Sequence, residues 1–248
     1  MAPRDGRCKV NMKDISLIGF MGCGKSSVGK ILATLLPECR LIDLDTYIEE
    51  KQGKNIPEIF NEYGEAAFRR MEREALEEIF SDKSRPRAIL SLGGGTVTSE
   101  QCRQLIRQHT DCFYLRATTD TLLDNLEGHS DGRPMLNPVQ PARFDASTSS
   151  ATDEEYNVDN RHSNSPKMSE PVAERVVRLG SPTIEAQSTE TSSEREALRR
   201  RIESLMQTRS PQYIATANHI IDINGLSFAQ IAALIKEAVE TNTLNIKR

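Results

Sequence analysis

The stretch Gly19-Phe20-Met21-Gly22-Cys23-Gly24-Lys25-Ser26 follows an apolar run at residues 15–18 and opens a helical pattern that continues to Leu36. It has the form G-x-x-x-x-G-K-S of a phosphate-binding P-loop, in the strand–loop–helix context that this motif requires. Its glycines let backbone N–H groups close round a polyphosphate, and the N-terminus of the next helix adds a positive dipole. We expect Lys25 to reach the β- and γ-phosphates and Ser26 to bind Mg²⁺. The motif predicts nucleotide binding but does not define the reaction.

Composition limits the class of protein. The chain has 248 residues and a formal net charge of −4, which suits one sizeable α/β core and argues against a nucleic-acid binder dominated by phosphate contacts. No apolar run approaches transmembrane length, and the N-terminus lacks the apolar core of a signal peptide. The five cysteines lack C-x-x-C spacing and fit reduced thiols. We expect a cytoplasmic monomer that binds neither nucleic acid nor a membrane.

Strand and helix patterns alternate along the chain. Short apolar runs predict strands at residues 15–18, 41–45, 88–92, 112–115 and 219–223. Helical patterns cover residues 25–36, 46–50, 57–63, 65–80, 99–109, 119–126 and 227–241. This alternation predicts a three-layer α/β/α fold, with a parallel sheet covered on both faces. Ligands collect at the carboxyl ends of such strands, where the P-loop, the two acids after the second strand and a triple glycine fall.

One long segment departs from this pattern. From about residue 139 to 193 the composition shifts to Ser, Thr, Asn, Pro and charged residues. Such a segment buries too little apolar surface to offset its ordering entropy. We predict a largely disordered insertion within a single domain, residues 1–248, preceded by a loose extension at 1–11. An apolar island at 172–179 either docks an unknown partner or is part of a fluctuating loop.

Two charged pairs bear on the second substrate. Asp43 and Asp45 end a predicted strand, and we expect one of them to serve the metal while the other faces an acceptor hydroxyl. Such acids also cap helices. Arg69 precedes Glu72 by three residues on a predicted helix, which suits either a held side chain or a solvated surface pair.

Two further features fall in predicted turns and loops. The triple glycine at 93–95 permits close approach of backbone to a ligand, or forms only a tight turn. Arg133, in G-R-P-M-L, and Arg209, in R-S-P-Q-Y, are predicted in loops on either side of the insertion. Each feature alone is weak evidence for a second substrate site. Their combined order after a P-loop is stronger evidence for one.

In this order, the P-loop, L-I-D-L-D, F-R-R-M-E, S-L-G-G-G, G-R-P-M-L and R-S-P-Q-Y resemble the shikimate kinase family. The resemblance covers about residues 13–136 and 194–239. It implies a P-loop NTPase core of the nucleoside-monophosphate-kinase-like type with a five-stranded parallel sheet. It also implies a shikimate-binding segment at 44–80 and a lid at 127–193 that carries the insertion. The implied reaction transfers phosphate from ATP to the 3-hydroxyl of shikimate, a step toward chorismate and the aromatic amino acids.

The resemblance implies a role for each matching position on the acceptor side. Arg69 and Arg209 would bind the shikimate carboxylate, which suits planar guanidinium groups. Asp45 would bind the ring hydroxyls, either removing a proton or orienting the group. Gly94 and Gly95 would bring backbone to the ring, with Glu72 orienting the first arginine.

On the nucleotide side, the resemblance implies that Lys25 and Arg133 act with Asp45 in catalysis. Mg²⁺ would be held by Ser26 and, through water, by Asp43. The residues assigned to ATP are Gly22, Cys23, Gly24, Lys25, Ser26, Ser27 and Arg133. Since residues 126–130 lack the arginine that often stacks on adenine in this family, adenine is expected either to bind more weakly or to rest on the loop at Asn224-Gly225. The Cys23 thiol is expected either to react, being close to a helix N-terminus, or to be inert.

Two other functions stay open. A different small-molecule P-loop kinase, such as a gluconate kinase, would share the nucleotide site, but a neutral acceptor would not need two arginines. A non-catalytic shikimate-kinase-like binding module would be expected to lack some functional residues. All five are present: Lys25, Asp45, Arg69, Arg133 and Arg209.

Overall fold

The computed structural model describes residues 13–126 and 184–246. The predicted N-terminal extension, Arg133 and most of the predicted lid and insertion therefore lie outside the described residues. The sheet and the helices that cover it belong to one compact unit, to which residues 13–126 and 191–246 contribute. Residues 138–190 belong to a second unit, of which 184–190 are described as the start of a helix.

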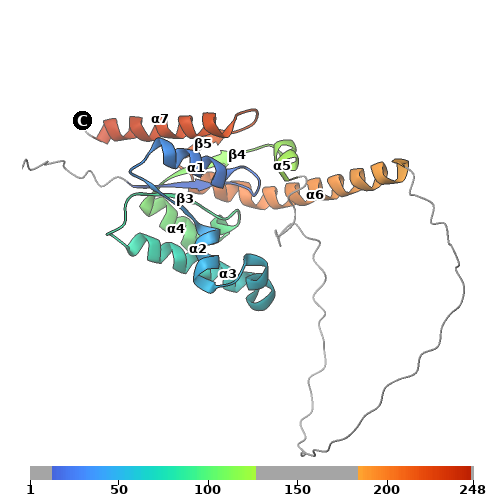
Figure 1. Ribbon diagram of the computed structural model, residues 1–248, viewed down its shortest axis with the longest axis horizontal. Helices are drawn as coiled ribbons and strands as arrows, with labels where there is room; N and C mark the ends of the chain where they lie inside the picture. The colour runs from blue at the N-terminus through green and yellow to red at the C-terminus, as the bar shows by residue number, and fades with distance from the viewer. Residues whose placement is uncertain (1–12, 127–183, 247–248) are drawn as a thin grey trace, which may run out of the picture. The chain divides into compact units, whose positions relative to one another are not determined.

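The predicted five-stranded parallel sheet is confirmed (Figure 1). Its strands are β1 (Asp14–Ile18), β2 (Arg40–Asp43), β3 (Ala88–Ser91), β4 (Thr110–Arg116) and β5 (His219–Asp222). Their order is β2-β3-β1-β4-β5, and every neighbouring pair is parallel. β1 is the middle strand, and the chain leaves it first toward one edge and later toward the other. The P-loop after β1 therefore lies at the topological switch point, where ligands bind in such sheets.

Helices follow most of the predicted patterns. They are α1 (Lys25–Leu35), α2 (Leu44–Gln52), α3 (Ile56–Ser81), α4 (Glu100–His109), α5 (Thr119–Leu126), α6 (Ile184–Thr216) and α7 (Phe228–Ile246), with a 3₁₀ turn at Thr96–Thr98. Ser99 caps α4 as predicted, since its side chain accepts from the N–H of Cys102. The two patterns predicted at 57–63 and 65–80 form the single element α3, which has a kink at Gly64 (φ 76°, ψ 171°). Among the described helices, none is both long enough and apolar enough to cross a membrane.

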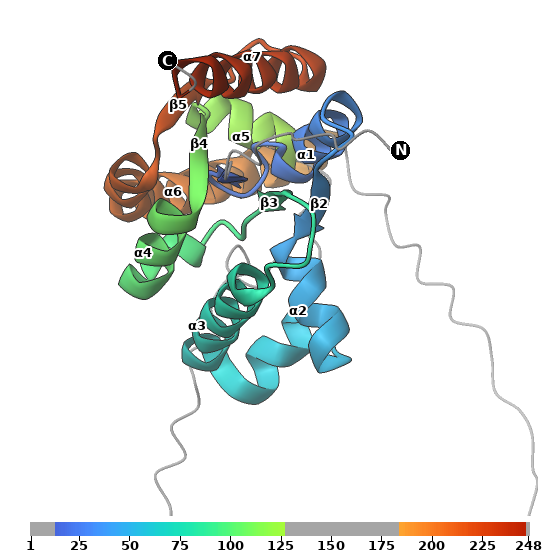
Figure 2. The same cartoon turned by 90° about the vertical axis from the view of Figure 1, so that its left-hand side faces the viewer.

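The sheet separates two buried clusters because neighbouring side chains of a strand point to opposite faces. On β1, Leu17 packs with α1, α5 and α7, while Ile18 packs with α2, α3 and α4. On β4, Phe113 and Tyr114 divide in the same way. Figure 2 shows α1 and α7 on one side of the sheet and α3 and α4 on the other. Both faces are buried, as the near-continuous apolar strands predict.

Helix α6 corrects two predictions. It begins at Ile184, so residues 184–193 are helical rather than disordered, and it includes Arg209, which was predicted in a loop. Pro211 lies inside the helix and suggested a break. The helix continues through it because α6 is anchored on both sides, by Ile202 in one buried cluster and Tyr213 in the other. Tertiary packing thus outweighs the local preference of proline.

A buried ion pair fixes the start of β1. Both Asp14 and Arg85 have side chains less than 15% exposed, and they meet through two hydrogen bonds. Asp14 also accepts from the N–H of Ala88 at the start of β3, at 2.8 Å. We predict that Asp14→Ala lowers the free energy of unfolding by about 3 kcal/mol, because it strands a buried guanidinium and a backbone donor. Urea denaturation measures this change.

The matched control is Asp120→Ala. Asp120 also pairs with an arginine, Arg199, at 2.6 Å, but its side chain is 70% exposed. The loss there should stay below about 1 kcal/mol. Equal losses for the two variants would contradict the role given to Asp14.

Candidate active site

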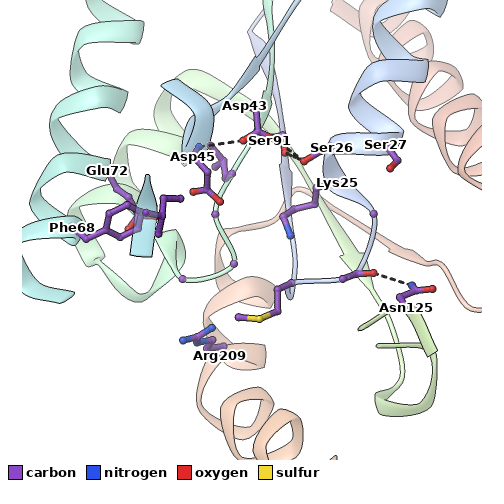
Figure 3. Close-up of a pocket in the computed structure, with 18 of the residues that line it drawn as sticks. Lys25, Ser26, Ser27, Asp43, Asp45, Phe68, Glu72, Ser91, Asn125 and Arg209 are labelled. Atoms are coloured by element: carbon purple, nitrogen blue, oxygen red, sulfur yellow. Dashed lines mark hydrogen bonds between the residues drawn. The ribbon is translucent and has the colours of Figure 1, made fainter. Parts of the chain in front are cut away.

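A cavity of about 570 Å³ opens at the carboxyl ends of the central strands (Figure 3). Its walls come from the P-loop and the start of α1, the β2–α2 junction, α3, the turn after β3, and α6. Of the sequence-predicted site residues that the structure describes, all but Cys23 contribute to it: Gly22, Gly24, Lys25, Ser26, Ser27, Asp43, Asp45, Arg69, Gly94, Gly95 and Arg209. The structure therefore brings the nucleotide motif and the acceptor-side residues to one place.

The P-loop backbone depends on glycines with positive φ. Gly22 and Gly24 have φ of 84° and 83°, a region that other residues rarely adopt. The ammonium of Lys25, at the first position of α1, donates to the carbonyls of Gly19 and Phe20, both at 2.9 Å. Lys25 is thus folded against its own loop, and its side chain must turn to meet a phosphate.

The Cys23 side chain does not face the cavity. It is fully buried in the cluster that α1, α5 and α7 share, and Lys25 Nζ lies 3.6 Å from its sulfur. Of the two alternatives for this thiol, its burial favours the inert one, because a fully buried side chain is inaccessible to reagents. Any contact of Cys23 with a nucleotide must come from its backbone.

Asp43 and Asp45 do not share a strand, which corrects the strand predicted at 41–45. β2 ends at Asp43, and α2 begins with the next residue. Asp43 is the N-cap, and its Oδ1 accepts from the N–H groups of Asp45 and Thr46 at 3.2 and 3.5 Å. The capping role, which the sequence also allowed, is the one the structure shows. Asp45 consequently lies in the first turn of α2.

The other oxygen of Asp43 faces α1. Ser26 Oγ donates to Asp43 Oδ2 at 2.7 Å and lies 3.3 Å from Ser91 Oγ. These hydroxyl and carboxylate oxygens are the donors that Mg²⁺ prefers. No group of three or more His, Cys, Asp and Glu side chains in the described residues is arranged to hold a metal. A Mg²⁺ ion here would therefore take most of its ligands from water and phosphate, as is usual for this ion.

Asp45 is an unusual carboxyl group. Burial, followed by the Glu72 and Asp43 carboxylates, raises its pKa to about 7, while Lys25 acts in the opposite direction. Its proton therefore exchanges near neutral pH. A perturbed acid in a cleft, beside a phosphate-binding loop, is a candidate for proton transfer.

Arg69 is held by two carboxylates on α3. Its Nη1 donates to Glu72 at 2.6 Å and its Nη2 to Glu65 at 3.0 Å. Glu72 is fully buried and also accepts from the Thr96 hydroxyl, so this is not a solvated surface pair. Burial raises the pKa of Glu72, which the Arg69 charge opposes. A Cβ at position 95 would overlap the Arg69 guanidinium, so the turn after β3 needs Gly95 for this packing.

Arg209 approaches the same cavity from α6. It is buried, and burial lowers its pKa, with the Arg69 charge acting in the same direction. Two buried donors, Arg69 Nε and Arg209 Nη1, have no hydrogen-bond partner among the described residues. Buried donors are normally paired. Two guanidinium groups with unpaired donors in one cavity could bind a small anion, such as a carboxylate or a phosphate.

Sequence reasoning missed several cavity residues. Ser91 lies within the S-L-G-G-G motif, yet no role was predicted for it. Asn125, at the end of α5, donates to the Gly22 carbonyl at 2.9 Å. Phe228 lines the cavity beside Gly24, where a Cβ would collide with its ring. An aromatic residue just after a predicted strand and loop was the available signal for Phe228. The loop at Asn224-Gly225, predicted to hold adenine, does not line this cavity.

Comparison with known proteins identifies the family. A family model described as shikimate kinase matches residues 21–181. The shikimate kinase of Sulfurihydrogenibium sp. (strain YO3AOP1) is 41% identical over 125 residues, which cover 50% of this chain and 72% of that protein. The chain belongs to the shikimate kinase family. The shikimate kinase of Enterococcus faecalis (strain ATCC 700802 / V583) is 43% identical over 125 residues, covering 50% of this chain and 71% of that protein.

Solved structures of shikimate kinases share the fold. The shikimate kinase from Acinetobacter baumannii in complex with shikimate superposes with a TM-score of 0.66, covers 94% of this chain and 96% of that one, and is 24% identical. The shikimate kinase from Bacteroides thetaiotaomicron has a TM-score of 0.63 at the same identity, with coverages of 92% and 99%. The sequence predictions of family and of fold class are confirmed.

The burial of Cys23 generates a prediction about thiol chemistry. In the native protein, iodoacetamide should label Cys23 at least about a hundredfold more slowly than in urea, because labelling requires local opening of the core. Saturating nucleotide should change this rate little. Peptide mapping by mass spectrometry, following the Cys23 peptide alone, measures both rates. Fast labelling that nucleotide suppresses would show that the thiol faces the cavity.

Proposed function

We propose that this chain transfers the γ-phosphoryl group of ATP to the 3-hydroxyl of shikimate, giving ADP and shikimate 3-phosphate. The observation that carries the proposal is the pair of guanidinium groups, Arg69 and Arg209, in the cavity that also holds the P-loop. Their unpaired donors suit the carboxylate of shikimate. A neutral sugar would offer these unpaired donors no anionic group.

The nucleotide half of the reaction follows from the P-loop. Shikimate kinases use ATP, generally with Mg²⁺, which neutralises phosphate charge when bound. Gly22, Cys23, Gly24 and Ser27 would contribute backbone N–H groups to the phosphates. Lys25 would turn from its loop carbonyls to the β- and γ-phosphates, and Ser26 and Asp43 would hold the metal through oxygen. Phe228 offers an apolar surface for adenine beside the loop.

The acceptor half depends on Asp45. In the proposed reaction, the 3-hydroxyl oxygen attacks the γ-phosphorus, and the bond from phosphorus to the β–γ bridging oxygen breaks. Asp45 accepts the hydroxyl proton, for which a pKa of about 7 is suited. Arg69 and Arg209 fix the ring by its carboxylate, so the hydroxyl is presented in line. Arg133, in the proposed lid, would stabilise charge on the transferring group with Lys25.

Two further parts of the proposal concern the state and location of the enzyme. The monomer predicted from the sequence stays a prediction. Four described cysteines, at positions 23, 39, 102 and 112, are free and buried, which fits the reducing cytoplasm. The segment at 44–80 would bind shikimate and the segment at 127–193 would close over it.

A coupled assay of ADP release tests the function. Shikimate should stimulate ADP release from ATP and Mg²⁺, whereas gluconate and nucleoside monophosphates should not. Stimulation by gluconate alone would favour a different small-molecule kinase. Shikimate binding by calorimetry without ADP release would favour a non-catalytic module.

The pair Arg69 and Arg209, called the clamp from here on, generates a prediction about shikimate binding. Arg69→Lys keeps the charge but removes the planar pair of donors, so the KM for shikimate should rise at least about tenfold. The KM for ATP should change less than about twofold. Arg73→Lys is the control, because Arg73 lies one turn further along α3 and its side chain is 37% exposed. A rise in the KM for ATP with an unchanged KM for shikimate would show that the substrate assignment is wrong.

The raised pKa of Asp45 generates a prediction about the pH dependence of the reaction. Asp45 must be ionised to accept a proton, and its pKa in the free protein is about 7. The kcat/KM for shikimate should therefore be level above pH 7 and fall about tenfold per unit below it. Steady-state rates between pH 5.5 and 9, at saturating ATP, measure the profile. If the pH profile of kcat/KM had its midpoint below pH 5, Asp45 would have an ordinary pKa. The variant Asp45→Asn should lose most of the activity at every pH.

A further inference from the structure

Tyr213 has no part in the reaction described above, yet it is placed beside two residues that do. It lies on α6 one turn after Arg209, on the same face of the helix. It is fully buried, and its ring stacks on Tyr114 with centroids 4.9 Å apart. A phenylalanine would fill the same space. The hydroxyl therefore needs a separate explanation, since burying one without partners is costly.

The Tyr213 hydroxyl donates to the carbonyl of Gly94 at 2.5 Å. In a trans peptide, the carbonyl of Gly94 and the N–H of Gly95 lie in one plane and point in opposite directions. The N–H of Gly95 thus points away from Tyr213, and no hydrogen bond occupies it within the described part of the chain. By holding one end of this peptide, Tyr213 fixes the direction of an unused donor at the cavity wall.

Tyr213 also lies beside Arg209, with which it interacts electrostatically. The Arg209 guanidinium lies 6.0 Å from the centroid of the Phe20 ring, in the P-loop. Burial raises the pKa of Tyr213, so the hydroxyl stays protonated and can donate to Gly94. Phe20 and Tyr213 thus leave the guanidinium little freedom to turn.

Resting on the proposed function, we propose that Tyr213 is a positioning residue for shikimate. Its ring lies beside Arg209 and its hydroxyl holds the Gly94–Gly95 peptide, so a guanidinium from α6 and a backbone N–H from the turn after β3 are presented to the substrate in fixed register. The substrate then meets donors whose orientation is already set, which lowers the entropy lost on binding.

Tyr213→Phe tests the proposal, because it removes one oxygen and keeps the ring stacked. The KM for shikimate should rise about tenfold, the effect of one hydrogen bond in a polar site. The kcat should stay within about threefold, since the contact acts on the bound substrate and the transition state alike. The KM for ATP should change less than about twofold. A purely structural role would lower the melting temperature without this separation of KM from kcat.

Tyr114→Phe is the matched control. It makes the same change in the stacked partner, whose hydroxyl meets Ser210 rather than the glycine turn. It should lower the melting temperature comparably while leaving the KM for shikimate within about twofold. Equal KM changes in both variants, or none in Tyr213→Phe, would overturn the proposal.

A second measurement uses the unaltered protein and does not depend on a variant folding. Saturating shikimate should slow amide hydrogen exchange at residues 93–96 and in the part of α6 around Arg209. Protection of α6 without the turn would overturn the proposal. Failure of the wild-type protein to release ADP with shikimate would instead overturn the proposed function, so the two failures are distinguishable.

Discussion

Two guanidinium groups of like charge are held in one cavity, and most of the site is arranged around that constraint. Each is largely removed from water, where their repulsion is less screened than at a surface. Arg69 is compensated by the buried Glu72 and the half-exposed Glu65. Arg209 has a weaker set of neighbours, the Tyr213 hydroxyl and the Phe20 ring. The arrangement is satisfied fully only when an anion takes up the remaining donors, which is the physical basis of its selectivity.

The acidic side of the cavity shows the opposite imbalance. Asp43 is stabilised by a helix N-terminus and the Ser26 hydroxyl, whereas Asp45 has two carboxylates among the charges that act on it. Two acids only two residues apart thereby differ in environment. Asp43 has surroundings that suit a neighbour of a metal ion, and Asp45 has those of a proton acceptor near neutral pH. The step from β2 to α2 creates the difference, because it places one residue at the cap and the other inside the first turn.

The sequence predicted the sheet, most helices and the set of residues round the cavity, because these depend on local pattern and on motif spacing. It failed where tertiary contacts decide. Pro211 suggested a loop, but packing of Ile202 and Tyr213 keeps α6 helical. From the sequence, Asp43 and Asp45 could equally end a strand or cap a helix. The structure shows the cap, because α2 begins directly after Asp43. Cys23 lies in a motif that faces phosphate, yet its side chain points into the core. The placement of Phe228 against Gly24 brings together residues distant in the chain, which no single-sequence pattern encodes.

The clamp joins α3, from the first half of the chain, to α6, which comes after the long segment predicted as an insertion. A carboxylate bound by both arginines would therefore act as a removable cross-link between distant parts of one polypeptide. Such a ligand binds the folded chain alone, so it shifts the folding equilibrium in proportion to its concentration. Substrate supply would then set the lifetime of the enzyme in the cell as well as its rate. The number of residues between the two arginines has little influence on this stabilisation, because the folded chain already holds both side chains in one cavity before the ligand binds.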